Sequence, residues 1–243
     1  MITGKKPRKP IPPSITKRFL GSGAAHMGQT AILSPFLLFF GGFFSRLAHR
    51  RFYAWKTRFM QQPVSLVQSR IGPGLTGDLV LSLANTPVRR LLYIGTAGTL
   101  DSAVDIGDIV VAEKAIVGEG FSAYFLPGQE EIPARTTDVR LALELLAGYF
   151  PDRGVHSGSV YSVASLVAED RELVDRLQKR QVTAIDMETS ALYTAAKTIG
   201  IRALSIQLIT DRPPDKSALL DKFPLLGLRR LIRFMTRSAH LFA

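Results

Sequence analysis

Residues 182–197, VTAIDMETSALYTAAK, join an apolar run to a pattern of small residues, and two acids lie at the junction. The run at 182–185 predicts a short buried strand, and the residues after Glu188 have the spacing of a helix. If the strand continued through Asp186 and Glu188, their side chains would point to opposite faces, and only one would face a ligand. Spacing alone favours acids that stabilise the start of a helix; the alternative is a carboxylate that binds vicinal hydroxyls, as in a ribose.

Strand-like runs and helical patterns alternate along most of the chain. Strands are predicted at residues 63–69, 89–94, 107–117, 158–167 and 201–211, and helices at 75–86, 138–150, 169–180 and 225–242. This alternation predicts an α/β fold. We expect a single-domain, three-layer architecture in which helices flank a central mixed β-sheet.

Three predicted loops lie at the carboxyl ends of strands, where α/β sheets bind small ligands. Their sequences are IGTAG (94–98), DMET (186–189) and ITDRP (209–213). In the first, small residues let backbone N–H groups approach an anion, and Thr96 adds a hydroxyl donor; a plain glycine turn is the alternative. In the third, Asp211 is either a general acid or a cap of the following turn.

The content of Cys and His argues against disulfide bonds and metal sites. The 243 residues are 46% hydrophobic, which allows a substantial core, and include no Cys and only 4 His. The lack of Cys removes disulfides and thiolate metal ligands and agrees with a reducing, cytoplasmic location. No two His residues have the spacing of a zinc site. We therefore expect no metal and no organic cofactor.

The net charge of +11 is concentrated at the two ends of the chain. Residues 5–18 carry six cations and no acid, and residues 225–242 form a basic amphipathic pattern. We expect residues 1–18 to be a flexible basic arm and residues 19–243 to form the domain. The alternative is attraction of these ends to a membrane surface or a polyanion. No nucleic-acid partner is expected, since no nucleic-acid-binding motif is present.

Residues 31–44, AILSPFLLFFGGFF, are the most apolar stretch. The stretch is shorter than the roughly 20 residues that a membrane-spanning helix needs, and Pro35 and two glycines interrupt it. The sequence SRLAHRR that follows does not fit the cleavage site of a signal peptide. A core helix is favoured over a helix that associates with a membrane.

No single motif is specific to one protein family, but the order of the motifs along the chain is. The stretches HRRFYAWK, PVSLVQSRIGPG, RRLLYIGTAGTLDSAVDIGDIVV, GSVYSVASL, AIDMETSALYTAA and GIRALSIQLITD follow one another from about residue 49 to residue 212. In this order and spacing the sequence resembles the nucleoside phosphorylase and nucleosidase superfamily, with its purine and uridine phosphorylases and its nucleosidases. The resemblance implies a phosphorylase/hydrolase-like fold and an enzyme that cleaves the N-glycosidic bond of a nucleoside.

The resemblance also implies roles for residues that would hold the two halves of a nucleoside. Met187 and Glu188 match the ribose-binding pair, with Glu188 accepting hydrogen bonds from the 2′ and 3′ hydroxyls. Asp211 matches the general acid that serves N7 of a purine, which requires a raised pKa. Leu166 and Thr210 fall in the base pocket, and Leu166 stands where purine-branch enzymes place a Phe.

The same resemblance leaves the nucleophile open between phosphate and water. Thr96 and Gly95 match the phosphate or water site, and Arg50 matches an Arg that reaches the phosphate site of a neighbouring subunit, which implies a homo-oligomer. Tyr93 stands where the closest phosphorylases carry an Arg, and a Tyr does not replace a bidentate charged clamp. Tyr93 therefore favours hydrolysis, whereas Thr96 and Arg50 are consistent with phosphorolysis.

The hypothesis from the sequence is a phosphorylase (a glycosyltransferase) or a nucleosidase (a hydrolase) of a purine-type nucleoside, with phosphate as a co-substrate in the first case. Two alternatives stay open. One is a nucleosidase that acts on a lipid-linked adenosine, of the kind found in the hopanoid pathway, at a membrane surface. The other is a nucleoside-binding protein without catalysis. The expected location is the cytoplasm, with peripheral membrane contact in the lipid-linked case.

Overall fold

The structure, a computed structural model, describes residues 11–36, 45–46, 54–59, 62–215 and 225–242. Its strands belong to one sheet with the order β10-β6-β8-β9-β5-β1-β4-β3-β2, and β7 pairs with β6. The strands are β1 (Thr30–Ser34), β2 (Ser45–Arg46), β3 (Ala54–Phe59), β4 (Gln62–Gln68), β5 (Arg90–Thr99), β6 (Ile109–Gly118), β7 (Glu131–Pro133), β8 (Val155–Val163), β9 (Ala184–Asp186) and β10 (Arg202–Asp211).

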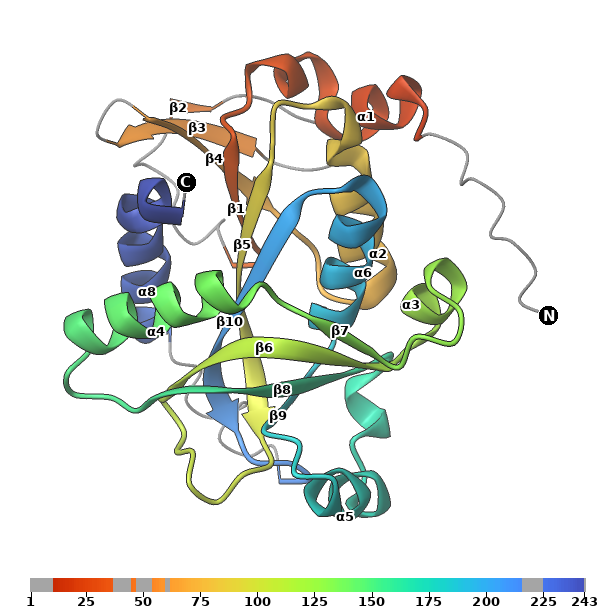
Figure 1. Ribbon diagram of the computed structural model, residues 1–243, viewed down its shortest axis with the longest axis vertical. Coiled ribbons are helices and arrows are strands. Elements are labelled where there is room, and N and C mark those ends of the chain that lie inside the picture. The colour runs from red at the N-terminus through yellow and green to blue at the C-terminus, as the bar shows by residue number, and fades with distance from the viewer. Residues whose placement is uncertain (1–10, 37–44, 47–53, 60–61, 216–224, 243) are drawn as a thin grey trace.

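Pairing between β10 and β5 closes part of the sheet on itself. β10 runs parallel to β5 and antiparallel to β6, while β9 runs parallel to β8 and antiparallel to β5. The strands β5, β10, β6, β8 and β9 therefore form a ring, and β1, β4, β3 and β2 extend the sheet from β5. The ring brings the carboxyl ends of β5, β9 and β10 together, which positions the site described below (Figure 1).

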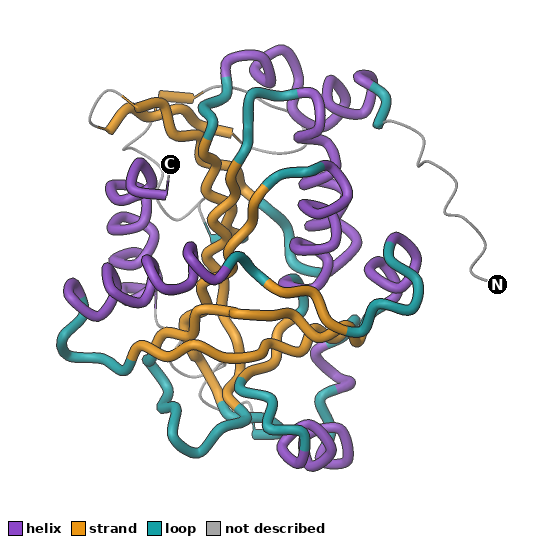
Figure 2. Tube along the Cα trace, in the orientation of Figure 1, coloured by secondary structure: helices purple, strands orange, loops and turns teal. Residues whose placement is uncertain are grey.

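Helices cover both faces of the sheet (Figures 1 and 2). On one side α2 and α6 pack on a core that includes Leu79 and Leu192, and on the other α4 and α8 pack on a core that includes Leu146 and Leu231. The helices are α1 (Pro13–Leu20), α2 (Pro73–Leu81), α3 (Gly120–Phe125), α4 (Thr136–Tyr149), α5 (Arg171–Lys179), α6 (Thr189–Ile199) and α8 (Leu225–Ser238), with 3-10 turns η1 (Gly21–His26), η3 (Ser82–Asn85), η4 (Leu166–Ala168) and η5 (Ala239–Phe242). The predicted α/β class, with helices flanking a central mixed sheet, is confirmed.

The predicted helix at residues 31–44 is wrong where the structure describes this stretch. Residues 31–34 belong to β1, a strand whose five residues are all buried. β1 lies between two parallel neighbours, and Ile32 pairs with Leu66 on one side and Leu92 on the other. These partners are distant in sequence, so the local pattern did not reveal the strand. Residues 37–44 lie outside the described residues.

The predicted loop at residues 94–98 is also wrong, because β5 continues through it to Thr99. Gly95 pairs with Gln207, and Gly98 pairs with Ile185. The glycines allow close packing rather than a turn. A Cβ on Gly95 would lie 2.5 Å from the Gln207 side-chain oxygen, and one on Gly98 would lie 2.6 Å from the ring of Pro213.

The predicted basic arm, residues 1–18, overlaps a helix. Residues 1–10 lie outside the described residues, and α1 begins at Pro13, a residue that suits the first turn of a helix. Thr16 is buried, and its hydroxyl donates a hydrogen bond to the Ser82 carbonyl at 2.7 Å. The part of the arm from residue 13 onward therefore packs on the domain.

Candidate active site

Asp186 ends β9 and stabilises the first turn of α6. Its carboxylate accepts hydrogen bonds from the Thr189 backbone N–H at 3.0 Å, the Thr189 hydroxyl at 2.5 Å and the Ser162 hydroxyl at 2.6 Å. The Gln207 amide donates a further bond at 3.0 Å. Burial nevertheless raises the pKa of Asp186. The helix-stabilising interpretation of the two acids therefore describes Asp186.

Glu188, two residues later, is held differently. Its side chain is 6% exposed, and its carboxylate accepts the Gly72 backbone N–H at 2.6 Å. Gly72 has φ +107°, a conformation that favours glycine. Burial, reinforced by the charge of Asp186, raises the pKa of Glu188 to about 8, although the Gly72 N–H and the Tyr93 phenol both favour the ionised form.

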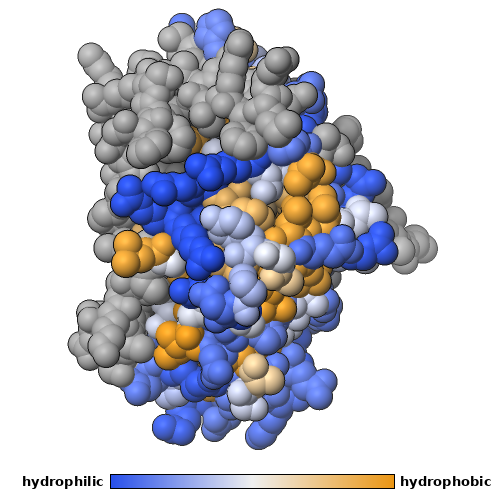
Figure 3. Space-filling model, turned by 90° about the vertical axis from the view of Figure 1, so that its left-hand side faces the viewer, coloured by the Kyte–Doolittle hydropathy of each residue, from blue (hydrophilic) through white to orange (hydrophobic). Residues whose placement is uncertain are grey.

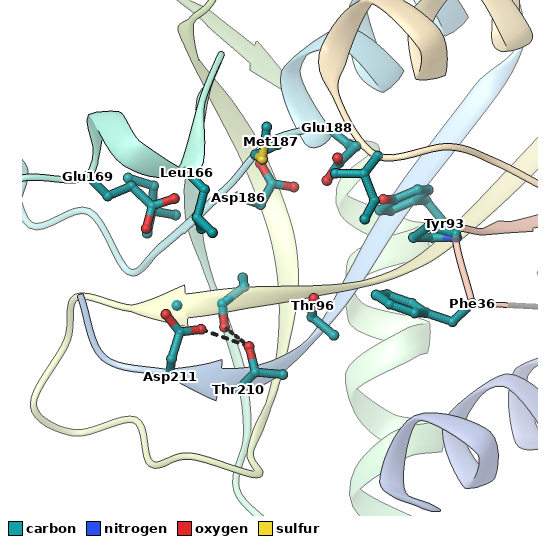
Figure 4. A pocket seen from close by; sticks show the side chains of 15 residues that line it. Phe36, Tyr93, Thr96, Leu166, Glu169, Asp186, Met187, Glu188, Thr210 and Asp211 are labelled. Carbon is teal, nitrogen blue, oxygen red and sulfur yellow. Dashed lines mark hydrogen bonds between the residues drawn. The ribbon is translucent and has the colours of Figure 1, made fainter. Parts of the chain in front are cut away.

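A cavity of about 290 Å³ opens beside Glu188 (Figure 4). Six of the residues predicted for the site line it: Thr96, Leu166, Met187, Glu188, Thr210 and Asp211. Gly95 does not line the cavity, since its Cα faces Gln207 and Tyr93 inside the sheet. Arg50 lies outside the described residues. The cavity thus brings together the ends of β5, β9 and β10.

Asp211 lies at the other end of the cavity from Glu188 (Figure 4). It is the last residue of β10 and is 3% exposed. The Thr210 hydroxyl donates a hydrogen bond to the Asp211 carboxylate at 2.8 Å and lies 3.4 Å from the Ala97 carbonyl oxygen. The two carboxylates therefore face one cavity from opposite ends, with Met187 and Thr96 between them.

The lining residues that the sequence analysis missed include Phe36, Ile71 and Glu169. Phe36 follows β1, which was itself predicted as a helix. Glu169 was predicted to open an exposed helix, but α5 begins at Arg171. The N-cap of α5 is Asp170, whose carboxylate accepts the Leu173 N–H at 2.8 Å. An Asp followed by helical spacing was the available signal that the helix begins after Glu169.

The electrostatic character of the cavity is acidic. Asp186, Glu188, Glu169 and Asp211 line it, and among the lining residues that the structure describes none is Lys, Arg or His. No group of His, Asp and Glu in the described part of the chain has the arrangement of a metal site. The cavity suits a ligand that donates hydrogen bonds or develops positive charge.

The family model described as "Phosphorylase superfamily" matches residues 42–226. Among curated relatives, DeoD-type purine nucleoside phosphorylases of Bacillus cereus and Bacillus thuringiensis are 31% identical over 124 residues, which is 51% of this chain and 52% of theirs. The chain thus aligns with about half the length of the curated relatives it matches.

Solved structures share the fold over most of the chain. A 5′-methylthioadenosine/S-adenosylhomocysteine nucleosidase of Helicobacter pylori has a TM-score of 0.74 and 20% identity, covering 88% of this chain and 99% of its own. Futalosine hydrolase of the same organism has a TM-score of 0.74 and 20% identity, covering 89% and 100%. A uridine phosphorylase of Vibrio fischeri has a TM-score of 0.75 and 19% identity, covering 89% and 93%.

Proposed function

The chain belongs to the phosphorylase superfamily, and within it we propose that the protein cleaves the N-glycosidic bond of a purine-type nucleoside. One observation carries the proposal: Glu188 and Asp211 line the same cavity from opposite ends. A nucleoside has a sugar rich in hydroxyl donors at one end and a base with ring nitrogens at the other. An acid at each end matches that division.

At the sugar end, Glu188 accepts hydrogen bonds from two ribose hydroxyls, and Met187 packs beside the ring. The transition state of glycosidic cleavage carries positive charge on the sugar. An ionised Glu188 stabilises that charge more than it stabilises the neutral substrate, which is the requirement for catalysis. The hydrogen bond from Gly72 holds the carboxylate in place before the substrate binds.

At the base end, negative charge moves onto the departing base, and a proton on N7 neutralises it. Asp211 is the group we assign to that proton transfer, as a general acid. The Thr210 hydroxyl orients its carboxylate. Leu166, from η4, packs on the flat face of the base, and together these residues place the leaving group opposite the sugar site.

We infer that water, rather than phosphate, is the nucleophile. Phosphate binds where cations or convergent N–H donors meet it, and the described wall of the cavity has no cation. Tyr93, which stands where phosphorylases of the resembling type carry Arg, is fully buried beside Glu188. Thr96 lines the cavity and supplies a hydroxyl that orients the attacking oxygen in either case.

A nucleoside screen tests both parts of the proposal. Adenosine, inosine, guanosine, uridine and 5′-substituted adenosines would be incubated with the protein, with and without phosphate, and the free base quantified by HPLC. We expect a purine base and free ribose to appear without phosphate. Strict dependence on phosphate would overturn the proposal that water is the nucleophile. Failure to release base from any nucleoside would overturn the proposal that the protein is an enzyme.

A second candidate is a nucleoside with an apolar tail, cleaved at a membrane surface. Ile71 and Leu166 line the cavity and are 61% and 41% exposed, so its mouth has apolar side chains open to solvent. Figure 3 shows the face that carries α4 and α8, where hydrophilic residues adjoin apolar patches. Within the described residues, no helix has the length and apolar character needed to cross a membrane.

Sedimentation with anionic liposomes tests this candidate. The basic face of α8, which carries the exposed residues Arg229, Arg230, Arg233 and Arg237, predicts binding that weakens as salt rises. If the protein does not sediment with liposomes at any salt concentration, cleavage at a membrane surface is excluded. A cytoplasmic location and a homo-oligomer complete the proposal, and light scattering of the purified protein tests the oligomer.

A further inference from the structure

Tyr93 brings a phenol hydroxyl to the sugar end of the cavity. The residue lines the cavity from β5, and its side chain is fully buried. Gly95, two residues later on the same face of the strand, leaves room for the ring, because a Cβ there would lie 2.6 Å from a ring carbon of Tyr93. Figure 4 shows the phenol beside Glu188, at the end of the cavity away from Asp211.

The Tyr93 hydroxyl has no hydrogen-bond partner of ordinary distance and angle among the residues that the structure describes. Burial, followed by the charges of Glu188 and Asp186 and by the interaction of the hydroxyl with the Glu188 carboxylate, raises the pKa of the phenol well above its ordinary value. The hydroxyl therefore stays protonated. Phenol and carboxylate are close enough to interact, but they do not meet in the geometry of a direct bond.

A sugar hydroxyl fits between these two groups. The phenol offers a proton, whereas an ionised carboxylate only accepts hydrogen bonds. A hydroxyl of the ligand both donates and accepts, so it can accept from Tyr93 while it donates to Glu188. Leaving the buried phenol without a good partner costs free energy, and a ligand that supplies the partner removes that cost.

We propose that Tyr93 is a specificity-determining residue that donates a hydrogen bond to a ribose hydroxyl, the same hydroxyl that donates to Glu188. The inference rests on the proposed function and extends it to the choice of sugar. A site built to bind a hydroxyl rejects an analogue that lacks it, because the buried groups of the protein then lose their partner. Tyr93 thus favours a ribonucleoside over the deoxynucleoside that lacks the bridging hydroxyl.

Calorimetry with adenosine, 2′-deoxyadenosine and 3′-deoxyadenosine tests the proposal. The measurements use Asp211→Asn, which should bind these nucleosides without cleaving them, with and without Tyr93→Phe. At about pH 9 Glu188, with a pKa of about 8, is mostly ionised. We expect Tyr93→Phe to weaken adenosine binding by about tenfold. It should leave the affinity for one of the two deoxy analogues unchanged, because that analogue lacks the bridging hydroxyl.

Tyr193→Phe is the matched control. Tyr193 is a buried phenol on α6, outside the cavity, whose hydroxyl donates to the Ala112 carbonyl at 2.7 Å and accepts the Ser205 N–H at 3.0 Å. Its loss should lower the melting temperature and leave the preference for adenosine unchanged. Tyr93→Phe should do the reverse in the ligand-free protein, because its hydroxyl has no such partners.

Two results would overturn the role of Tyr93 while leaving nucleoside cleavage intact. One is an unchanged preference for adenosine over both deoxy analogues in a folded Tyr93→Phe variant. The other is a loss of melting temperature in Tyr93→Phe as large as that in Tyr193→Phe, since the hydroxyl would then serve the fold. Failure of the wild type to cleave any nucleoside would instead overturn the proposed function.

Discussion

Asp186 and Glu188 are two residues apart, yet they have different hydrogen-bond partners and different roles in the structure. Asp186 accepts four hydrogen bonds from side chains and backbone around the start of α6. Glu188 faces the cavity and accepts one bond from Gly72. Sequence spacing placed both acids at a strand–helix junction, but their long-range partners distinguish them: Ser162 and Gln207 bind Asp186, and Gly72 binds Glu188. Such partners cannot be inferred from local pattern.

The raised pKa of Glu188 predicts how stability depends on pH. The folded carboxyl titrates near pH 8, against an ordinary value of 4.5, so between these values the folded state holds more protons than the unfolded state. Stability contributed by Glu188 is therefore lost as pH rises from 4.5 to 8, by at most about 1.4 kcal/mol per pH unit. Thermal melts from pH 5.5 to 8 should show a shallower decline for Glu188→Gln than for the wild type. Identical slopes would contradict the assignment.

Asp186→Asn should move the protonation of Glu188. The negative charge of Asp186 is the second cause of the raised pKa, after burial, so removing it lowers the pKa of Glu188. Ribose binding, which we expect to tighten as Glu188 ionises, should then reach its plateau at lower pH than in the wild type. Calorimetric titration across pH 6 to 9 measures this shift. An unmoved midpoint in a folded variant would show that the two acids are not coupled.

Asp211→Asn separates an enzyme from a protein that only binds nucleosides. Asn keeps the size of the side chain but has no carboxyl proton to give to N7. We expect kcat to fall by about 100-fold or more while nucleoside affinity changes by less than tenfold. Rapid-quench kinetics and calorimetry measure the two quantities. Undiminished base release by the variant would remove Asp211 from the mechanism.

The loop before α2 is joined to the site by a hydrogen bond from Gly72 to Glu188. Gly72, at φ +107°, donates its N–H to Glu188, whereas Gly74, two residues later, has an ordinary conformation with open space around it. Gly72→Ala should cost about 1–2 kcal/mol through backbone strain and weaken ligand binding. Chemical denaturation and calorimetry measure these effects.

Gly74→Ala is the matched control. It lies inside α2, where Ala is the better helix former, and should be neutral or slightly stabilising. Equal stabilities of the two variants would show that the conformation of Gly72 carries no strain for Ala.

Most elements were predictable where the pattern is local. The amphipathic helices α4 and α5 and the strands β4, β6, β8 and β10 lie where their periodicity placed them. The errors fell where pairing between distant strands decides the structure. Residues 95–98 look like a glycine turn, but pairing with β9 and β10 extends them as a strand. Residues 31–34 look like part of a helix, but two parallel neighbours make them a strand.

At the scale of the whole molecule, closure of the sheet creates the site. Thr96 lies near the end of β5, Glu188 follows β9 and Asp211 ends β10, and pairing of β10 with β5 helps to bring these positions to one cavity. The family's motif order allowed that convergence to be expected. The parts of the wall that no motif marked, Phe36 and Glu169, emerged only from the folded arrangement.

The central claim is that one nucleoside lies in this cavity with its sugar at Glu188 and its base at Asp211. A crystal structure of Asp211→Asn with adenosine tests it most directly, because the variant should bind the substrate without cleaving it. We predict that the 2′ and 3′ hydroxyls lie within hydrogen-bond distance of Glu188 and that N7 lies beside residue 211. Adenosine bound outside the cavity, or bound with its base against Glu188, would contradict the account.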